Sequence, residues 1–516
     1  MDFYRNNTSI PPVSYLQSTI TNVHYFSPSS ALPVLWHVKW RLITTLILLQ
    51  IVYNLFFHPL RKVPGPFFAK ATGLWRIIRY FRGTWHDDIM DLHRQYGQVV
   101  RISPGESSFY NGFLVPKMTI SFFATRDNKV HRFLRSRVAS TYSMTSILSM
   151  ESLIQDVLDL NFKKLGERAD EGEKFEVDKT VNYYTSDVIS QLALGGMVGC
   201  VEQQKDVGGM IQSVHDGFYF MGNLGVLPWQ MFWINNPVSK WFTKNFGGDR
   251  LNGFDIFLDW LDKRVEERMT NGLLPNQRRD ILQNFIEAKD PHGQPASKEE
   301  VMIEGVNVLA GGSDTTAFGI LSCLRHLLTS PDAKAKLIEE IDHAYEALGL
   351  AAEGREISFK QAEKLPYLSA VITESNRVQP SIQYQLPRTV PSEGAQVGDY
   401  FLPPGTTCGT NSRAVNCSRG IFGRDAEDFR PERWIAQSPE DEARIRKEKL
   451  LLMTFGMGSR SCVGKNLAIV ELYLYIAQFF RHFDAEVANS AKPSGIKSQW
   501  ISLHHDFVVT ISRRDH

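Results

Sequence analysis

The sequence predicts a mainly α-helical fold with small β-sheets, preceded by one N-terminal transmembrane helix. Helical periodicity dominates the chain from about residue 71 onward. Short β-like segments occur at 99–103, 396–402 and 507–511. An uncharged, mostly apolar run at 42–57 has the composition of a membrane-spanning helix.

The composition is that of a folded globular protein. Of the 516 residues, 43% are hydrophobic and 22% are charged, which excludes wholesale disorder, collagen and coiled coil. The net charge of +1 gives no electrostatic footprint for nucleic acid. The five cysteines match neither a zinc spacing nor a dense disulfide framework, which favours a reducing compartment.

Four parts are expected along the chain. At about 150 residues per domain, length alone suggests three or four domains, but large enzymes often form a single domain. After residue 71 the sequence has no internal repeat and no low-complexity linker. The parts are therefore a polar tail at 1–32, a transmembrane anchor at 33–57, a proline-rich hinge at 58–70 and one large domain at 71–516.

The uncharged run 42–57 is too short by itself to span a membrane as a helix. As a helix, residues 42–57 span about 24 Å, against a hydrocarbon core of about 30 Å. A start near Pro33 makes the helix long enough, with Trp36 and Trp40 at the interface. The alternative is a buried core helix. The basic, proline-rich segment 58–66 favours the anchor, and its prolines predict a stiff extended connector.

The flanking charges predict the orientation of the anchor. Two basic residues, Lys39 and Arg41, precede the uncharged run 42–57, and four Lys or Arg residues follow it within twenty residues. Because positive residues favour the cytosolic side, the large domain is expected in the cytosol. The tail would then be luminal, with Asn6 and Asn7 in glycosylation sequons.

The longest helical candidate covers residues 298–329, about 48 Å at the helical rise. Ser297, with Glu300 three residues later, forms a capping box that marks its start, and Ser330-Pro331 marks its end. A second helix is expected directly after it, at 332–348.

Cys462 lies in a glycine-rich segment, 455–464, with the sequence FGMGSRSCVG. Glycines allow tight turns and a close approach of the backbone to a flat ligand. An apolar helix is expected at 467–480, and a cysteine just before a helix has a lowered pKa, which favours the thiolate. Such a thiolate is a metal or haem ligand or a nucleophile, whereas the ordinary alternative is a buried free cysteine. The loop alone leaves these alternatives open.

This loop resembles the haem-binding signature of the cytochrome P450 superfamily at every position of Phe455-x-x-Gly458-x-Arg460-x-Cys462-x-Gly464. The resemblance covers about residues 55–516, and the entry to the large domain resembles the fungal membrane-bound (microsomal) branch. It implies the cytochrome P450 fold, with heme b (iron-protoporphyrin IX) as cofactor. Cys462 would be the axial ligand of the iron, and Phe455, Gly458 and Arg460 would contact the haem.

Three further motifs of the family precede this loop, in the order that the family has them. Glu374-x-x-Arg377 and Arg433 (in FRPERW) would form a buried network that holds the thiolate loop in place. In GGSDTT, Thr315 would donate a hydrogen bond to dioxygen and Asp314 would relay protons, while the glycine pair leaves space and loosens the helix. The plainer alternatives are an exposed ion pair for E-x-x-R and back-bonding of Thr315 within its own helix.

The two propionates of a haem need cationic or hydrogen-bonding partners. By resemblance these are Arg460, Arg388 and the pair His131-x-x-x-Arg135, whose members lie one helical turn apart. Arginine suits this role because its planar fork binds a carboxylate with two hydrogen bonds. The family usually has tryptophan at the position of His131, so this part of the site is altered.

The resemblance implies a haem-thiolate monooxygenase of the endoplasmic reticulum membrane. It would insert one oxygen atom from O2 into an apolar small molecule, by hydroxylation or epoxidation in fungal secondary metabolism. The chain has no flavin or nicotinamide fingerprint, so NADPH would supply electrons through a separate membrane reductase, with cytochrome b5 as a further donor. Two alternatives stay open: a haem-thiolate isomerase or dehydratase that does not use O2, and a non-catalytic haem-binding membrane protein.

Two features bear on the substrate pocket. By family position, the segments 381–386 and 500–505 would line it. The connection between Phe109 and His131 has 21 residues, markedly fewer than the family usually has. Either the gene model has lost coding sequence or the lid over the pocket is shortened. A shortened lid predicts water access and loose coupling.

Overall fold

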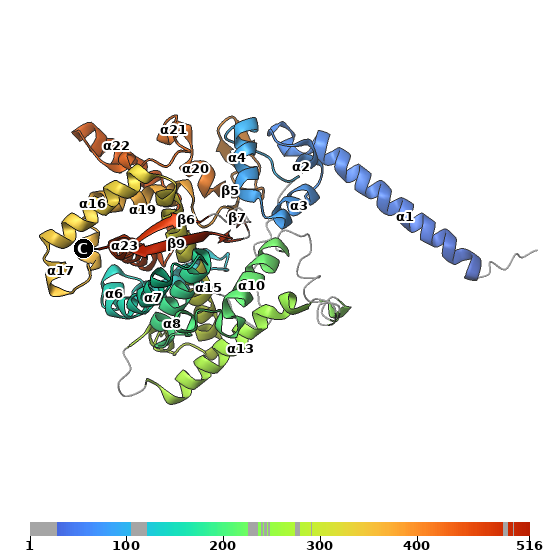
Figure 1. Cartoon of the computed structure of the whole chain (residues 1–516). Coiled ribbons are helices and arrows are strands. Elements are labelled where there is room, and N and C mark those ends of the chain that lie inside the picture. The colour runs from blue at the N-terminus through green and yellow to red at the C-terminus, as the bar shows by residue number, and fades with distance from the viewer. Residues whose placement is uncertain are drawn as a thin grey trace, which may run out of the picture.

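The computed structural model describes residues 28–104, 121–224, 236–238, 241, 245, 248–273, 279–289, 292–488, 494–498 and 500–515. These residues form a mainly helical body with small sheets, from which α1 (Pro28–Val52) projects (Figure 1). The predicted fold class is confirmed. Asn6 and Asn7, and the predicted tail up to residue 27, lie outside the described residues.

The first half of the body is built from helices that surround one long central helix. After α1 come η2 (Tyr53–Phe57, a π-helical turn), η3 (Pro59–Lys62), α2 (Phe67–Ala71), α3 (Leu74–Arg82), α4 (Trp85–Tyr96), α5 (Asn128–Ala139), α6 (Met144–Leu148), α7 (Glu151–Glu171), α8 (Val177–Leu194), α9 (Cys200–Gln203), η4 (Val207–Gly209), α10 (Met210–Leu224), α13 (Gly248–Asn271), α14 (Ile281–Ile286) and α15 (Lys298–Leu328).

The second half carries shorter helices and ends on a long buried one. It contains α16 (Pro331–Ala347), α17 (Leu350–Glu353), α18 (Phe359–Ala362), α19 (Pro366–Val378), α20 (Ser412–Asn416), α21 (Arg419–Phe422), η5 (Pro431–Trp434), α22 (Pro439–Leu451), η6 (Gly458–Arg460) and α23 (Lys465–His482). The predicted helices at 298–329, 332–348 and 467–480 correspond to α15, α16 and α23.

The described strands form four small antiparallel sheets. They pair as β1 (Phe175–Glu176) and β6 (Phe483–Val487) on either side of β9 (Val508–Arg513), β2 (Gln385–Thr389) with β5 (Thr407–Asn411), β3 (Ala395–Val397) with β4 (Tyr400–Leu402), and β7 (Gly495–Ser498) with β8 (Ser502–His505). The predicted β-segment at 396–402 is the β3–β4 hairpin, and the one at 507–511 lies in β9, so both predictions are confirmed.

Helix α15 is the centre of the core. It packs against α8, α13, α19 and α23, and most of its residues are buried. Its capping box is confirmed: Glu300 N–H donates to Ser297 Oγ (3.2 Å), and Ser297 N–H donates to Glu300 Oε2 (2.9 Å). Residues at different positions along this helix lie close to different neighbours: Gly305 to Leu261 of α13, Gly312 to Ile189 of α8 and Gly319 to Leu472 of α23.

The N-terminal helix is long and apolar enough to cross a membrane. The candidate span covers Trp36–Phe57, 22 residues or about 33 Å of helix, and almost none of it is buried in the body. Its helical conformation was predicted from residue 33, whereas the helix begins at Pro28. These features are compatible with a membrane anchor.

Two local predictions at the entry to the body are wrong. The connector 58–66 is not extended throughout, because Pro59–Lys62 forms a 3-10 turn; an extended stretch follows it. The segment 99–103 forms no strand: its Arg101 N–H makes a single backbone hydrogen bond to Pro64 O (2.6 Å), while the Arg101 side chain donates to Asn54 O (3.2 Å). Gly65 is required here, since a Cβ would collide with the Arg101 carbonyl.

Candidate functional site

The loop before α23 closes on itself around Cys462. Gly456 and Gly458 have φ values of 68° and 69°, a left-handed conformation that other residues rarely adopt. The Cys462 N–H donates to Phe455 O (2.8 Å), and Gly464 caps α23 directly after the loop. The glycines thereby fold the segment into a compact turn that presents the cysteine.

Cys462 differs from the other cysteines of the chain. All five are free; three are buried, Cys408 is half-buried, and Cys462 is the exposed one. Its predicted lowered pKa is wrong for the protein alone. Although the residue is exposed by its surface area, protein atoms crowd around the sulfur and hinder its solvation, which raises the pKa of the Cys462 thiol; the N–H groups of Gly464 and Lys465 and the charge of Arg135 act to lower that pKa. A bound metal ion would displace this proton, since metal binding deprotonates its thiol ligands.

A buried ion-pair network braces this loop. Glu374 and Arg377, both 0% exposed, are joined by two hydrogen bonds of 2.7 and 2.8 Å. Glu374 also accepts from Arg433 Nε (3.3 Å) and Trp434 Nε1 (2.8 Å). The E-x-x-R pair is therefore not an exposed ion pair, and the carboxylate is satisfied from several sides.

Asn416 connects the network to the cysteine loop, which the sequence did not indicate. Arg377 donates to the Asn416 carbonyl (2.6 Å). The Asn416 side chain accepts from Met453 N–H (2.8 Å) and donates to Thr454 Oγ1 (3.1 Å). Because Met453 and Thr454 directly precede Phe455, the network holds the start of the loop.

The middle of α15 has an open face. Gly311 is exposed, and a Cβ added to it would have no heavy atom within 4 Å. Gly312 has the opposite role, because a Cβ there would come within 2.7 Å of Ile189 on α8. Only one glycine of the pair leaves space; the other allows close helix packing. The helix is continuous from Lys298 to Leu328, including the glycine pair that was expected to loosen it.

Thr315 and Asp314 point to different neighbours. The Thr315 hydroxyl donates to Gly311 O (2.7 Å) on the open face, which is the back-bonding alternative. Asp314 is 1% exposed, and its Oδ1 lies 2.9 Å from Nε2 of His215 on α10. Among the described residues, its Oδ2 has no hydrogen-bond partner. His215 is 99 residues away in sequence, and no motif indicated it.

The four predicted propionate ligands are linked by electrostatic interactions, and Arg460 interacts with each of the other three. Burial, then the charges of Arg388 and Arg135, lower the pKa of Arg460. Burial, then the charges of Arg460 and Arg135, lower the pKa of His131. Arg135 donates to Ser461 O (2.8 Å) and Arg460 to Thr125 O (2.8 Å), while Arg388 donates to Pro387 O (2.8 Å).

These four nitrogen side chains form a site that would bind an anion. No Asp or Glu within the described ranges forms an ion pair with His131, Arg135, Arg388 or Arg460. Three arginines close together repel one another unless a negative group lies between them. A haem brings two carboxylates and needs an exposed thiolate beside them. The donor set around Cys462 therefore fits a haem.

A second buried acid lies on α15. Glu304 lines a small cavity with Arg137 and Glu300, and burial raises the pKa of its carboxyl to about 7. Its Oε2 accepts a hydrogen bond from Asn307 (3.1 Å). No motif pointed to this residue, because its burial arises from helices that pack over the start of α15.

The two predicted pocket segments meet each other. Ser502 N–H donates to Ser381 O (2.9 Å), and the rings of Tyr384 and Trp500 contact edge to face, 6.3 Å apart. The connection between Phe109 and His131 is described only from Ser121, so the prediction of a shortened lid lies mainly outside the described residues.

Comparisons with known proteins agree with this geometry. The family model of cytochrome P450 matches residues 86–510. A cytochrome P450 monooxygenase of Aspergillus terreus is 30% identical over 459 residues, which are 82% of this chain and 90% of that relative. A pisatin demethylase of Fusarium vanettenii is 31% identical over 472 residues, 85% of this chain and 88% of that protein.

A solved structure supports the same fold. The crystal structure of the cytochrome P450 CYP102L1 aligns with a TM-score of 0.63 and 20% identity, over 76% of this chain and 84% of that chain. The sequence matches extend across nearly the whole body. The chain therefore belongs to the cytochrome P450 family, and it is a haem-iron monooxygenase that acts on a small molecule with electrons from a redox partner.

Proposed function

We propose that this enzyme inserts one oxygen atom from O2 into an apolar small molecule, by hydroxylation or epoxidation, in fungal secondary metabolism. The observation that carries the proposal is the exposed thiol of Cys462 in a braced glycine loop, beside four nitrogen side chains without an acidic partner among the described residues. The relatives named as pisatin demethylase and as fungal monooxygenases support the setting.

In this proposal two groups of residues would hold heme b. Cys462 would supply the thiolate ligand, and the turn formed with Phe455 and Gly458 presents the cysteine. Arg135, Arg388, Arg460 and His131 hold the two propionates. When bound, the haem supplies the iron centre at which O2 is reduced. The buried network of Glu374, Arg377 and Arg433 fixes the position of the thiolate through Asn416.

Asp314 and Thr315 handle protons in this proposal. Thr315 Oγ1 lies on the open face of α15, next to the space left by Gly311. Its proton is directed to Gly311 O, so the hydroxyl must rotate about the Cβ–Oγ1 bond to donate toward a ligand in that space. Asp314 is one residue earlier, and its carboxylate is buried. This pair is what an oxygenase requires and what an isomerase or dehydratase does not.

The placement in the cell is also a proposal. Residues 33–57 form a single-pass anchor in the endoplasmic reticulum membrane, residues 58–70 a hinge and residues 71–516 the cytosolic catalytic domain. The exposed apolar span Trp36–Phe57 supports this topology. The tail 1–32 is luminal and carries a glycan at Asn6 or Asn7. An NADPH-dependent membrane reductase delivers the electrons, and cytochrome b5 is a second donor.

Oxygen consumption tests the reaction class. The full-length chain, reconstituted with an NADPH-dependent reductase in vesicles, is incubated with 18O2 and an extract from a strain that lacks the gene. We expect NADPH-dependent oxygen uptake and a metabolite that gains one 18O atom. A product change without oxygen uptake would identify an isomerase or dehydratase, and haem binding without either would identify a non-catalytic protein.

A further inference from the structure

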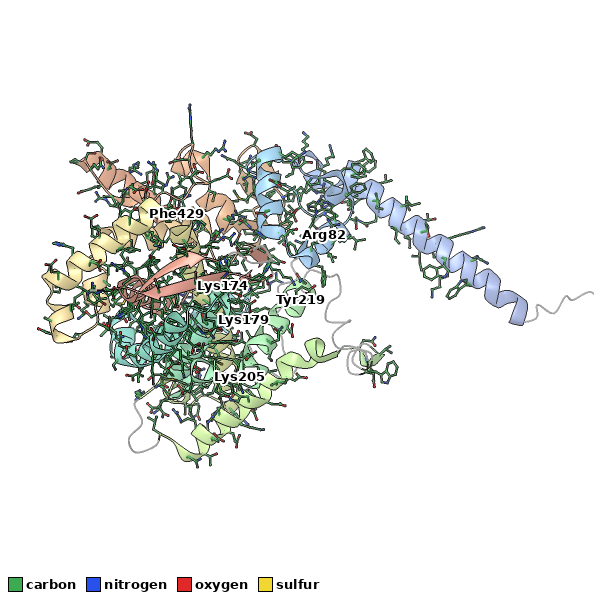
Figure 2. All side chains as sticks on the ribbon, viewed as in Figure 1. Arg82, Lys174, Lys179, Lys205, Tyr219 and Phe429 are labelled. Atoms are coloured by element: carbon green, nitrogen blue, oxygen red, sulfur yellow. The ribbon has the colours of Figure 1, made fainter. Side chains whose placement is uncertain are left out.

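Helix α10 carries a continuous stripe of contacts. His215, Tyr219, Gly222 and Asn223 are spaced by four, seven and eight residues, so they lie on one face of the helix. At one end of the stripe His215 reaches Asp314 on α15. In the middle, Tyr219, labelled in Figure 2, packs edge to face on Phe81, with the ring centroids 5.9 Å apart.

The other end of the stripe reaches the predicted pocket segments. Tyr384 Oη donates to Asn223 Oδ1 (3.2 Å). A Cβ added to Gly222 would lie 3.0 Å from the Cβ of Trp500. One face of α10 therefore connects the predicted pocket segments with the carboxylate proposed to relay protons.

His215 and Asp314 form an ion pair that is largely shielded from solvent. The two side chains are 19% and 2% exposed. Burial acts to lower the pKa of His215, but the charge and hydrogen bond of Asp314, with the charges of Asp206 and Asp216, outweigh it and raise that pKa. A buried carboxylate without a counter-charge is strongly destabilised, so Asp314 depends on this ring.

The other acidic groups near His215 have partners of their own. Asp206 accepts from Ile211 N–H (3.0 Å) and Gln212 N–H (2.9 Å), and Asp216 accepts from the Gln212 side chain (2.9 Å). Asp314 is therefore the carboxylate that directs the His215 ring. With Oδ1 held by His215, Oδ2 is left to exchange protons.

We propose that His215 is a positioning residue for Asp314, and that it ties the orientation of this carboxylate to the position of α10. The inference rests on the proposed proton-relay role of Asp314. Since α10 also contacts the pocket segments, a ligand that shifts α10 would shift His215 against Asp314. Oxygen reduction would then depend on occupancy of the pocket through a named pair of side chains.

The first test measures the ion pair itself and needs no turnover. Exchange of the histidine C2 hydrogen for deuterium, followed by mass spectrometry across a pH series, gives the pKa of individual histidines in the haem-loaded full-length chain. We expect the pKa of His215 to lie above the ordinary histidine value of about 6.5. We also expect Asp314→Asn to lower the pKa of His215, with the exposed His343 on α16 as the control histidine. A His215 pKa that does not respond to Asp314→Asn would overturn the proposal.

The second test asks whether the pair acts in turnover. The share of consumed O2 that leaves as hydrogen peroxide is compared in the wild type, His215→Leu, His215→Gln, Asp314→Asn and the double variant His215→Leu/Asp314→Asn. We expect His215→Leu to raise the ratio of peroxide to reduced product on the order of 10-fold. His215→Gln keeps a hydrogen-bond donor and should recover part of the loss. The double variant should resemble Asp314→Asn alone.

The outcomes separate this inference from the proposed function. If Asp314→Asn itself leaves the peroxide share unchanged, the proton-relay role fails and the inference falls with it. If Asp314→Asn raises the share but His215→Leu does not, the relay stands and the positioning role of His215 is wrong. Additive effects of the two substitutions would also contradict it. The haem content of each variant is measured first, and the pKa of His215 in the wild type remains decisive if His215→Leu does not fold.

Discussion

Removing Arg377 should prevent formation of a stable, haem-loaded protein. Its guanidinium is 0% exposed and donates to both oxygens of Glu374 and to the carbonyls of Asn416 (2.6 Å), Ala426 (2.5 Å) and Asp428 (3.2 Å). Arg377→Ala leaves the Glu374 carboxylate with Arg433, at 3.3 Å, as its one remaining cation among the described residues.

The magnitude follows from the groups left without a partner. Breaking a buried ion pair by removing one member costs about 3–5 kcal/mol. Each buried carbonyl that loses its donor adds about 1–3 kcal/mol. Against a total folding stability of about 5–15 kcal/mol, this loss removes most or all of the margin. Because Arg377 also holds Asn416, the cysteine loop loses its support at the same time.

A matched control is the exposed pair of Arg264 and Glu267 on α13. It has the same i,i+3 spacing, but its side chains are 56% and 63% exposed and 3.6 Å apart. Arg264→Ala should cost about 0–1 kcal/mol. Both variants are purified in detergent, and haem per protein and the thermal midpoint of Soret loss are measured. Arg377→Ala with the haem content and midpoint of Arg264→Ala would refute the structural role of the network.

Three further substitutions test separate parts of the site. Thr315→Ala should keep its haem but raise the peroxide released per NADPH, because the hydroxyl donor is lost, whereas Thr315→Ser should not; equal peroxide in the two variants would contradict the role of the hydroxyl. Arg460→Gln should speed haem transfer to apomyoglobin about 10–100-fold, as expected for the loss of a charge-assisted hydrogen bond of about 1.5–3 kcal/mol. The control Arg424→Gln changes an exposed arginine and should leave the transfer rate unchanged. Equal transfer rates in the two variants would show that Arg460 does not hold the cofactor. Burial raises the pKa of Glu304 to about 7 from the ordinary 4.5. Between these two pH values the folded state keeps a proton that the unfolded state releases. The free energy of unfolding should therefore fall by about 3 kcal/mol as the pH rises from about 4.5 through 7. Glu304→Gln should flatten this profile in thermal midpoints taken from pH 5 to 8; a variant profile parallel to the wild type would show that Glu304 does not titrate in this window.

Sequence reasoning succeeded where a feature is local. The capping box of α15 needs only Ser297 and Glu300, three residues apart, and the structure contains both hydrogen bonds. The turns of the cysteine loop are also local, because Gly456 and Gly458 adopt left-handed conformations that favour glycine. The family motifs extended this reading to Glu374 and its partners, which are distant in sequence.

Sequence reasoning failed where burial and pairing are set by distant segments. The segment 99–103 alternates like a strand, but Arg101 turns inward to Asn54, 47 residues away, and no neighbouring strand is present to pair with it in the described chain. His215 gave no signal, since its partner Asp314 lies on another helix. The direction of the Cys462 pKa shift also escaped prediction, because burial outweighs the helix N-terminus. Each of these depends on how helices pack, which no local pattern encodes.

The central claim is that Cys462 is the thiolate ligand of a haem, and the reduced carbonyl spectrum tests it most directly. The full-length wild type, reduced and exposed to carbon monoxide, should show the red-shifted Soret band of a thiolate-ligated haem. Cys462→Ser should lose that band, while Cys408→Ser, which changes a half-buried cysteine on β5, should retain it. Persistence of the red-shifted band in Cys462→Ser, or its absence from the haem-loaded wild type, would contradict the account.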